Sequence, residues 1–516
     1  MDKASRAILV GLFVVGFTIG TDFVGVGVLL GPIEENFDID DSTGQWVMNI
    51  YALTFAMLMV TGGRICDIYG RKKMLIVGLV IFAVAAVLNA TAIDIWWLLG
   101  SRALQGIGAA LMWPAVLGLL AATVPAAKLG SYMGILLMCI GLGNILGPIL
   151  GGVFAGIAPW GWRLFFGFNV VTSLTALGVV VFTARRAASD QKATDEQIDY
   201  AGIVVLSTAL FGLLYAFDAA ISDGWTSPVV IVLLVVFVAA LVAFPFVERR
   251  AKDPLVRPEL WHNKVFVAGV VLNGMVVVVA FVMFVYVPAY TQAIYGFTVA
   301  ESGLALIPLM IFFAGLSPVA GRIYDRVGPR KVMLTGYLFT VTGSVLVAAS
   351  ASSWGYAASL IPGLALAGFG AGLTIGPAGT IALEAVEEKD ASLAGGLGFT
   401  FHLSMGAIAI AIATLVLSMT VRNVVSEDLE ESGVQITVEE LADITGTVTG
   451  SGANVAVLDK LPEQDRAEVE AAVKDGRDKG FHVTFWVMSG ISAIGLLLIP
   501  LLPRGKIRAK EPAPAS

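Results

Sequence analysis

The chain has 516 residues, of which 57% are hydrophobic and only 14% are charged. Average soluble chains carry about a quarter charged residues, so the composition predicts a protein embedded in a membrane. It excludes a soluble enzyme with one membrane anchor, and it excludes a β-barrel, whose strands show short alternating segments instead of long apolar runs. The net charge of −7 argues against a nucleic-acid-binding surface.

Long apolar stretches recur along the whole chain. A bilayer-spanning helix needs about 20 mostly apolar residues, and windows of about 19 residues predict fourteen spans. They are 7–30, 46–62, 74–92, 95–122, 131–157, 164–183, 200–217, 229–247, 265–288, 303–321, 332–349, 357–378, 393–421 and 481–502. The first is not expected to be a cleaved signal, because it is too long and contains Asp22. The chain is therefore predicted to be an all-α polytopic membrane protein.

The positive charges are sorted to one side of these spans. With the amino terminus in the cytoplasm, most of the 32 Lys and Arg residues fall in inner segments such as 64–73, 249–264 and 322–331. The short outer loops then hold only Arg163. Short loops rich in Lys and Arg stay on the cytoplasmic side. We therefore expect a multi-pass protein of the cell's inner (plasma) membrane with both termini in the cytoplasm.

Segment 422–480 is the one sizeable stretch predicted to lie outside the membrane. Thr437 followed by Glu440 fits a helix capping box. Helix-forming residues follow Pro462 as far as Lys474. One or two short extracellular helices are predicted there, separated by a glycine-rich stretch at 446–452.

The chain contains an internal repeat. Residues 63–73 match residues 321–331 in Gly, Arg, Ile, Asp, Gly and the final Lys, and residues 105–111 echo residues 367–373 more weakly. Both copies of the first motif link two spans on the inner side. Duplicated halves around a central site are how many transporters achieve alternating access.

The repeat predicts three parts. Residues 1–184 form a first six-helix bundle from spans one to six. Residues 185–264 are a linker that carries spans seven and eight. Residues 265–516 form a second six-helix bundle from spans nine to fourteen, with 422–480 as its extracellular loop.

Three short motifs lie on the spans in order. They are Gly63-x-x-x-Asp67-x-x-Gly70-Arg71-Lys72, Arg102-x-x-Gln105-Gly106-x-Gly108 and Gly143-x-x-x-Gly147-Pro148-x-x-Gly151-Gly152. Together with Asp22 in the first span, they resemble the signature motifs of the major facilitator superfamily, and most of all its fourteen-span drug:proton antiporters. The resemblance covers nearly the whole chain. It implies the major facilitator fold, with 14 transmembrane helices as two six-helix bundles plus two inserted helices.

The loop after the second span is the candidate gating motif. Asp67 can face the N-terminus of a neighbouring helix, where partial positive charge favours an anion. In the resembled family this loop is thought to latch the two halves together on the inner side. A simple positively charged cytoplasmic anchor is the alternative. The candidate residues are Gly63, Asp67, Gly70 and Arg71, with Asp325 and Gly328 from the second copy.

Asp22, Arg102 and His402 are the candidates for proton coupling or substrate binding that the resemblance implies. A carboxylate in an apolar span is costly unless it faces an aqueous cavity, so we expect Asp22 to line one. Arg102 stays charged and needs Asp22, Gln105 or backbone carbonyls as a partner, unless it snorkels to the interface. His402 can either carry protons or serve as a packed core histidine.

The fifth span carries the motif that the resembled family uses in antiporters. Gly143, Gly147, Gly151 and Gly152 are expected to share one face and to allow close approach of a neighbouring helix. Pro148 removes a backbone hydrogen bond and is expected to kink the helix. Together they suit a leak-tight hinge, and ordinary tight packing is compatible with it. Tyr51 and Asn144 are further candidates for lining a central cavity.

The predicted function is proton-coupled export of lipophilic, cationic drugs by alternating access. No nucleotide-binding loop is present in the sequence, so an ion gradient must supply the work. The expected partners are a small lipophilic substrate, protons and the lipid bilayer, and the expected state is a monomer. No cofactor and no nucleic-acid partner is expected. No metal cluster is expected either, because Cys66 and Cys139 are the only cysteines.

An alternative is export of an endogenous lipid, metabolite or peptide with the same proton coupling. Some family exporters of divalent cations carry additional carboxylates in spans ten and thirteen. Here span thirteen has none, and span ten has only Glu301 just before its outer end. A membrane-embedded enzyme is disfavoured, since it would need clustered His, Asp or Glu at one membrane face.

Overall fold

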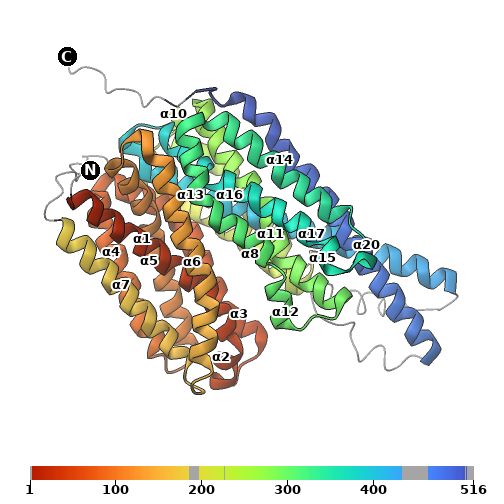
Figure 1. Ribbon diagram of the computed structural model, residues 1–516. Coiled ribbons are helices and arrows are strands. Elements are labelled where there is room, and N and C mark those ends of the chain that lie inside the picture. The colour runs from red at the N-terminus through yellow and green to blue at the C-terminus, as the bar shows by residue number, and fades with distance from the viewer. Residues whose placement is uncertain (1–2, 185–196, 226, 433–462, 506, 508–516) are drawn as a thin grey trace, which may run out of the picture.

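The computed structural model describes residues 3–184, 197–225, 227–432, 463–505 and 507 (Figure 1). Within these residues every regular element is a helix. The first part holds α1 (Lys3–Gly25), α2 (Leu30–Phe37), α3 (Asp41–Tyr69), α4 (Arg71–Ala90), α5 (Ile95–Thr123), α6 (Leu129–Ala155), α7 (Trp162–Ala184), α8 (Tyr200–Asp223) and α9 (Pro228–Glu248). The second part holds α10 (Pro258–His262), α11 (Lys264–Tyr295), α12 (Val299–Leu304), α13 (Ile307–Val327), α14 (Pro329–Ala348), α15 (Gly355–Ser359), α16 (Ile361–Glu384), α17 (Ala391–Ser432) and α20 (Glu463–Ile494).

Among the described residues, 14 helical segments are long and apolar enough to cross a membrane. The predicted number of spans and the all-α class are therefore confirmed. Side-chain caps set where several spans begin. Asp40 accepts from the backbone N–H of Thr43 at the start of α3, and Asp94 accepts from that of Trp97 at the start of α5. Such caps satisfy N–H groups that a helix start leaves without an intrahelical partner.

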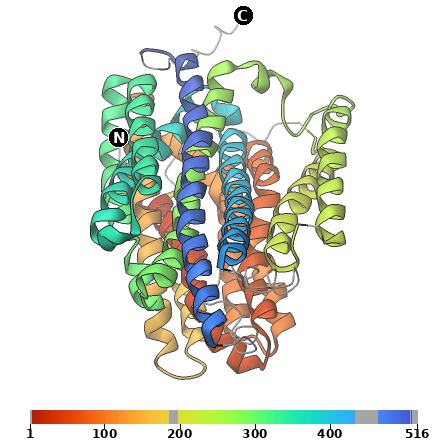
Figure 2. The same ribbon diagram turned by 90° about the vertical axis from the view of Figure 1, so that its right-hand side faces the viewer.

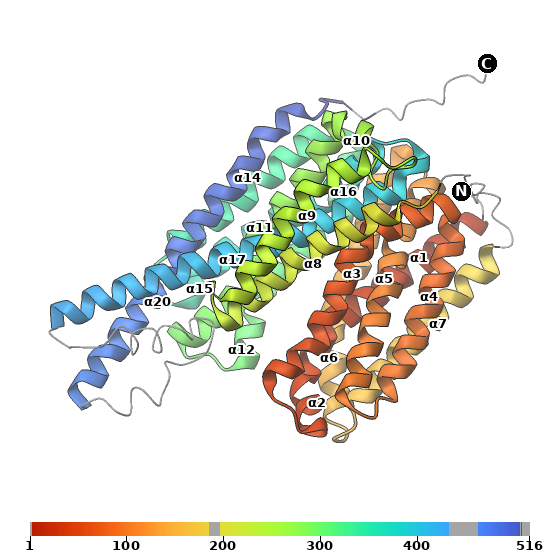
Figure 3. The same cartoon turned by 180° about the vertical axis from the view of Figure 1, so that it is seen from behind.

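The helices pack in two groups. In the first, α1 packs on α6 and α7, while α5 packs on α3 and α4. In the second, α16 packs on α11, α13 and α14, and α20 packs on α11, α14 and α17. Figures 1 and 3 show the two groups in contact near the end where the amino terminus lies, with their helices diverging toward α2 and α12. The exact domain boundaries at residues 184 and 265 stay a prediction.

Helices α8 and α9 form a pair beside the two groups, visible in yellow-green in Figure 2. They pack on each other, and α8 also contacts α3 of the first group and α17 of the second. Only 6% of the apolar window of α9 is buried, the lowest share among the 14 segments. A helix that is apolar all round and this exposed suits contact with lipid.

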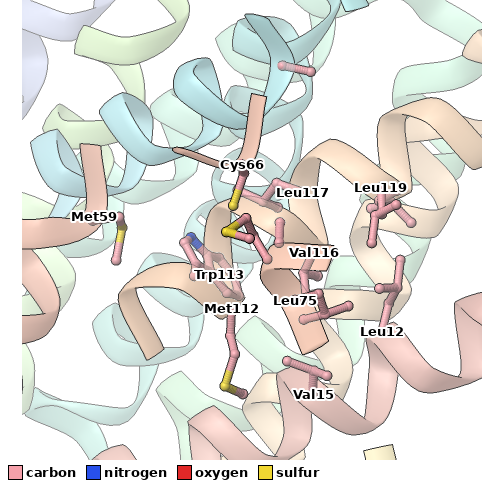
Figure 4. Close-up of a cluster of buried hydrophobic side chains, with 14 of the residues drawn as sticks. Leu12, Val15, Met59, Cys66, Leu75, Met112, Trp113, Val116, Leu117 and Leu119 are labelled. Carbon is pink, nitrogen blue, oxygen red and sulfur yellow. The ribbon is translucent and has the colours of Figure 1, made fainter. Parts of the chain in front are cut away.

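The core of the first group surrounds α5 (Figure 4). Leu12 and Val15 of α1, Cys66 of α3 and Leu75 of α4 pack against α5, which contributes Trp113 and its neighbours. The same core extends into the second group, where it includes buried residues from the first turn of α17. The two groups therefore share one apolar interior at this end.

Helices α17 and α20 correct the prediction for segment 422–480. The residues after Pro462 do not form a separate short helix, because α20 runs without a break from Glu463 into the last span. Helix α17 likewise continues to Ser432. An apolar stripe explains why both helices continue beyond the membrane span, since apolar side chains of α17 and α20 bury one another there. The stripe consists of Val421, Val425 and Leu429 on α17 with Val469, Ala472 and Val473 on α20. The predicted capping box at Thr437 and Glu440 and the stretch 446–452 lie outside the described residues.

The glycines of α6 let it pack closely on α1. A Cβ atom at Gly143 would lie 2.5 Å from the carbonyl oxygen of Phe17, and one at Gly147 would lie 2.5 Å from that of Thr21. Gly151 approaches the carbonyl oxygen of Gly25 in the same way. The prediction that Gly152 lies on the same packed face is wrong, because Gly152 is exposed and no atom of a neighbouring helix lies within 4 Å of an added Cβ. Three of the four glycines therefore share the packed face. Pro148 lies inside α6, which continues past it.

We expect Gly147→Ala to destabilise the protein and Gly152→Ala to leave its stability unchanged or slightly raised. The added methyl group meets backbone of α1 at Gly147, and overpacking of this kind costs about 1–3 kcal/mol. Both substitutions change helix propensity equally, so the second variant is a matched control. Thermal unfolding of the purified protein in detergent measures the difference. Equal melting temperatures for the two variants would contradict the packing described.

Candidate functional site

A buried ion pair lies in the interior of the first helix group. Oδ2 of Asp22 on α1 is 2.9 Å from Nη1 of Arg102 on α5, and both side chains are at most 1% exposed. Oδ1 of Asp22 accepts from Nε2 of Gln105 at 3.2 Å and from Nδ2 of Asn169 on α7 at 2.7 Å. Both carboxylate oxygens are therefore satisfied by donors from two neighbouring helices.

This geometry corrects the expectation that Asp22 lines an aqueous cavity. Asp22 has no exposed surface in this structure. A buried carboxylate is tolerated when a cation and further hydrogen-bond donors compensate for the lost hydration, and here a cation and two amides do so. Arg102, Gln105 and Asn169 therefore stabilise the Asp22 carboxylate in place of the water that we expected.

Arg102 has several further partners. Its Nε donates to the carbonyl oxygen of Val47 on α3 at 2.9 Å, and its Nη1 donates to Oε1 of Gln105 at 2.7 Å. Its guanidinium carbon lies 4.3 Å from the centre of the Tyr51 ring, at a distance typical of a cation–π contact. A snorkelling arginine is therefore excluded, because Arg102 points into the protein.

A second row of amides supports the pair. Oε1 of Gln105 also accepts from Nδ2 of Asn89 at 2.6 Å, and Oδ1 of Asn89 accepts from the hydroxyl of Ser101. Gln105 is thus fixed with its Nε2 toward Asp22. The sequence analysis missed Asn89, near the end of α4, and Asn169, in the first half of α7. An amide within an apolar span is a signal, since polar residues there usually bond across helices.

His402 lies in a different place, on α17 of the second group. Its ring stacks on Phe399 at 5.3 Å, and its Nδ1 lies 3.4 Å from Oδ1 of Asn273 on α11. Phe399 also contacts Phe55 of α3 at 5.9 Å, and Phe55 stacks on Tyr51. A row of aromatic rings therefore connects Arg102 in one group with His402 in the other.

The two cavity candidates differ in position. Tyr51 is 1% exposed and belongs to this aromatic row, and its hydroxyl is buried without a hydrogen-bond partner among the described residues. Asn144 on α6 is half-buried, and its Oδ1 would lie 3.1 Å from a Cβ atom at Gly20 of α1. No group of three His, Cys, Asp or Glu side chains in the described part of the chain is placed to hold a metal ion.

The first copy of the repeated loop joins the two groups. Oδ2 of Asp67, at the end of α3, accepts from the backbone N–H of Leu393 at 2.8 Å, and Oδ1 accepts from that of Ser392 at 3.3 Å. Asp67 thus lies at the N-terminus of α17, where the helix dipole favours an anion. Gly63 allows the approach, because a Cβ atom there would lie 2.7 Å from the Ser392 carbonyl oxygen.

Arg71 completes the first copy. Its Nε lies 3.0 Å from Oδ1 of Asp67, its Nη1 donates to the carbonyl oxygen of Gly118, and its Nη2 donates to that of Glu388 in the second group. Gly70 separates α3 from α4 with a φ angle of 99°, which favours glycine. Arg71 therefore bridges the two groups by its own hydrogen bonds and holds Asp67 in position.

The second copy mirrors the first. Oδ1 of Asp325, at the end of α13, accepts from the backbone N–H of Gly130 at 3.1 Å. Its Oδ2 accepts from the backbone N–H of Ser131 at 2.9 Å and also from the Ser131 hydroxyl. Asp325 thus lies at the N-terminus of α6 in the first group. Gly328, with a φ angle of 83°, forms the turn that corresponds to Gly70.

Comparison with known proteins agrees with this architecture. A family model described as Major Facilitator Superfamily matches residues 12–410. The chain is 30% identical over 397 residues to the puromycin resistance protein of Streptomyces alboniger, which covers 76% of this chain and 77% of that protein. It is 28% identical over 527 residues to the tetracenomycin C resistance and export protein of Streptomyces glaucescens, covering 99% and 94%.

Two further matches are consistent with these. The multidrug resistance protein Stp of Mycobacterium tuberculosis is 27% identical over 74% of this chain and 70% of its own length. The crystal structure of the human organic anion transporter MFSD10 superposes with a TM-score of 0.54 at 15% identity, covering 97% of this chain and all of that one. The solved structure supports the fold alone, and the relatives confirm the family resemblance of the sequence motifs.

We expect Arg102→Gln to lower the free energy of unfolding by about 3–5 kcal/mol, because it leaves the buried Asp22 carboxylate without its cation. The double variant Asp22→Asn, Arg102→Gln should be more stable than Arg102→Gln alone, since no charge is then left unpaired. Arg466→Gln, which breaks an exposed pair with Glu470, should cost at most about 1 kcal/mol. Thermal unfolding in detergent tests all three. Additive effects of the two site substitutions would contradict the coupling.

Proposed function

The chain belongs to the major facilitator superfamily, and on that premise we propose that it exports lipophilic, cationic small molecules in exchange for protons. Its family and its relatives make it a multi-pass membrane transporter and not an enzyme. The observation that carries the proposal is the Asp22–Arg102 pair, a carboxylate enclosed within the membrane-spanning part of the first group. Buried acids in such positions mark ion pathways in transporters.

Protonation of Asp22 supplies the coupling. The ionised carboxylate holds Arg102 of α5 and Asn169 of α7 against α1. A proton on Asp22 removes the ion pair and weakens the attachment of α1 to these helices. A proton that enters from outside and leaves inside would therefore change the packing of the first group once in each transport cycle.

The repeated loops support alternating access. Asp67 and Asp325 each bind the N-terminus of a helix in the opposite group, at the same end of the molecule. We place this end in the cytoplasm, in the plasma membrane, because the positive charges gather there. On this basis we assign the structure to an outward-facing state with its inner latch closed, and we propose that both termini are cytoplasmic. A single chain contains both halves of the latch, so we propose a monomer.

The aromatic row between the groups supports the substrate class. Tyr51 and Phe55 from α3, Trp113 from α5 and Phe399 from α17 lie ring to ring. Aromatic faces attract organic cations and flat apolar molecules, and the row carries no carboxylate of its own that would select a dication. The names of relatives, which refer to resistance to puromycin, resistance to and export of tetracenomycin C, and multidrug resistance, are consistent with this substrate class.

Transport in proteoliposomes tests the proton coupling. With an imposed pH gradient, the wild-type protein should move ethidium and puromycin, and ethidium movement should be accompanied by proton flux in the opposite direction. Asp22→Asn should abolish the gradient-driven movement, because an amide cannot take up the proton. Glu35→Gln, which changes an exposed acid on α2, is the matched control and should transport normally.

Full substrate-dependent proton flux in Asp22→Asn would overturn the coupling mechanism. Movement of neither probe by the wild-type protein would overturn the drug assignment. It would favour the alternative of an endogenous lipid, metabolite or peptide substrate, which a comparison of accumulated metabolites in a deletion strain would identify.

The latch makes a separate prediction. Asp67→Asn and Asp325→Asn should each shift the protein toward an inner-open state, because an amide binds a helix N-terminus more weakly than a carboxylate does. Spin labels at the exposed positions Lys73 and Arg322, one in each group, should report a larger share of long distances. Glu388→Gln is the control, since Arg71 uses only the backbone carbonyl of Glu388. Unchanged distances in both variants would refute the latch.

A further inference from the structure

We propose that Asn169 holds Asp22 in both its ionised and its protonated form, by turning its side-chain amide. The inference rests on the proposed function in one respect, namely that Asp22 takes up a proton. It assigns a positioning role to a residue of α7 that belongs to none of the three sequence motifs.

The two ends of the Asn169 amide are used unequally. Asn169 is fully buried, and its Nδ2 donates to Oδ1 of Asp22 at 2.7 Å. Its own Oδ1 is buried and has no hydrogen-bond partner among the described residues. A buried carbonyl oxygen without a partner is destabilising, because it has lost its hydration without gaining a hydrogen bond. This oxygen belongs to an amide that is hydrogen-bonded directly to the Asp22 carboxyl, and a buried polar atom left unpaired in a native structure is unusual.

Protonation of Asp22 creates the need that this oxygen can meet. A carboxylate only accepts hydrogen bonds, whereas a carboxylic acid also carries an O–H donor. The proton belongs on Oδ1 of Asp22, because Oδ2 faces the guanidinium of Arg102. Once Oδ1 carries a hydrogen, it needs an acceptor. A half-turn of the Asn169 amide replaces the N–H···O bond with an O–H···O bond to the Asn169 carbonyl.

Arg102 and Gln105, the other hydrogen-bond partners of Asp22, cannot accept the O–H of the protonated carboxyl. Arg102 has donors and no acceptor. Gln105 is locked, because its Oε1 accepts from both Arg102 and Asn89, and turning its amide would break two hydrogen bonds. Asn169 has no such restraint on its oxygen. After the half-turn its Nδ2 takes the place of the unpaired oxygen, so one polar atom stays unpaired in either state. The bond to Asp22 therefore decides the orientation.

The charged and titratable groups that face this carboxyl are Arg102 from α5 and Tyr51 from α3. The Tyr51 hydroxyl is the second buried polar atom here without a partner in the described part of the chain. It makes no hydrogen bond to Asp22, whereas Asn169 already does. Tyr51 is therefore the competing acceptor that an experiment has to separate from Asn169.

Infrared difference spectroscopy between high and low pH, on the full chain in lipid, tests the proposal. The C=O stretch of the protonated carboxyl is assigned by its loss in Asp22→Asn. Asn169→Leu should shift this band to higher frequency, as the acid loses its acceptor, and Asn169→Gln should restore it in part. Ser173→Ala removes a buried hydroxyl one turn along α7 that bonds only to backbone, and should leave the band in place.

A second measurement follows the asparagine side chain itself. In wild-type protein with its asparagine side chains labelled with ¹³C, an amide C=O band should shift together with Asp22 protonation, and Asn169→Leu should remove this signal. A carboxyl band that stays in place in Asn169→Leu, or that moves in Tyr51→Phe instead, would overturn the role of Asn169 and leave the proposed function intact. A pH difference spectrum without any band lost in Asp22→Asn would overturn both.

Discussion

A carboxylate and a guanidinium that are both removed from water set the arrangement of the first helix group. Such a pair is stable only when every charge and lone pair is met. Here Asp22 draws donors from α5 and α7, and Arg102 adds a carbonyl from α3. Helix α6 takes part through its glycines, since Gly143 and Gly147 pack against the backbone of Thr21, next to Asp22. Five helices are thus positioned around one ion pair.

The two groups are joined by the same physical device used twice. Each half contributes an aspartate at the end of one helix and the bare N-terminus of another. Because a helix N-terminus carries partial positive charge and free N–H groups, it binds the aspartate without any basic side chain of its own. Such a contact can break when the two groups separate, because water can then hydrogen-bond both to the aspartate and to the freed N–H groups.

Most of the fold could be read from the sequence because apolar span length and short motifs are local properties. The count of 14 spans followed from the apolar stretches, and the family resemblance followed from the motifs. The environment of Asp22 could not be read in this way, since Asn169 and Asn89 come from helices far along the chain. Gly152 has the same spacing signal as Gly151, yet only the rotation of α6 against α1 decides which of them is packed. The continuous α20 was missed because charged residues hid an apolar stripe that serves a helix pair and not a membrane.

The length of α17 has a mechanical consequence. At about 1.5 Å per residue, its 42 residues extend for about 63 Å, roughly twice the thickness of the hydrocarbon core. Helix α17 begins at the contact with Asp67 and runs on to its pairing with α20. A rotation of this helix by a few degrees about its N-terminus would therefore displace its far end by several ångströms.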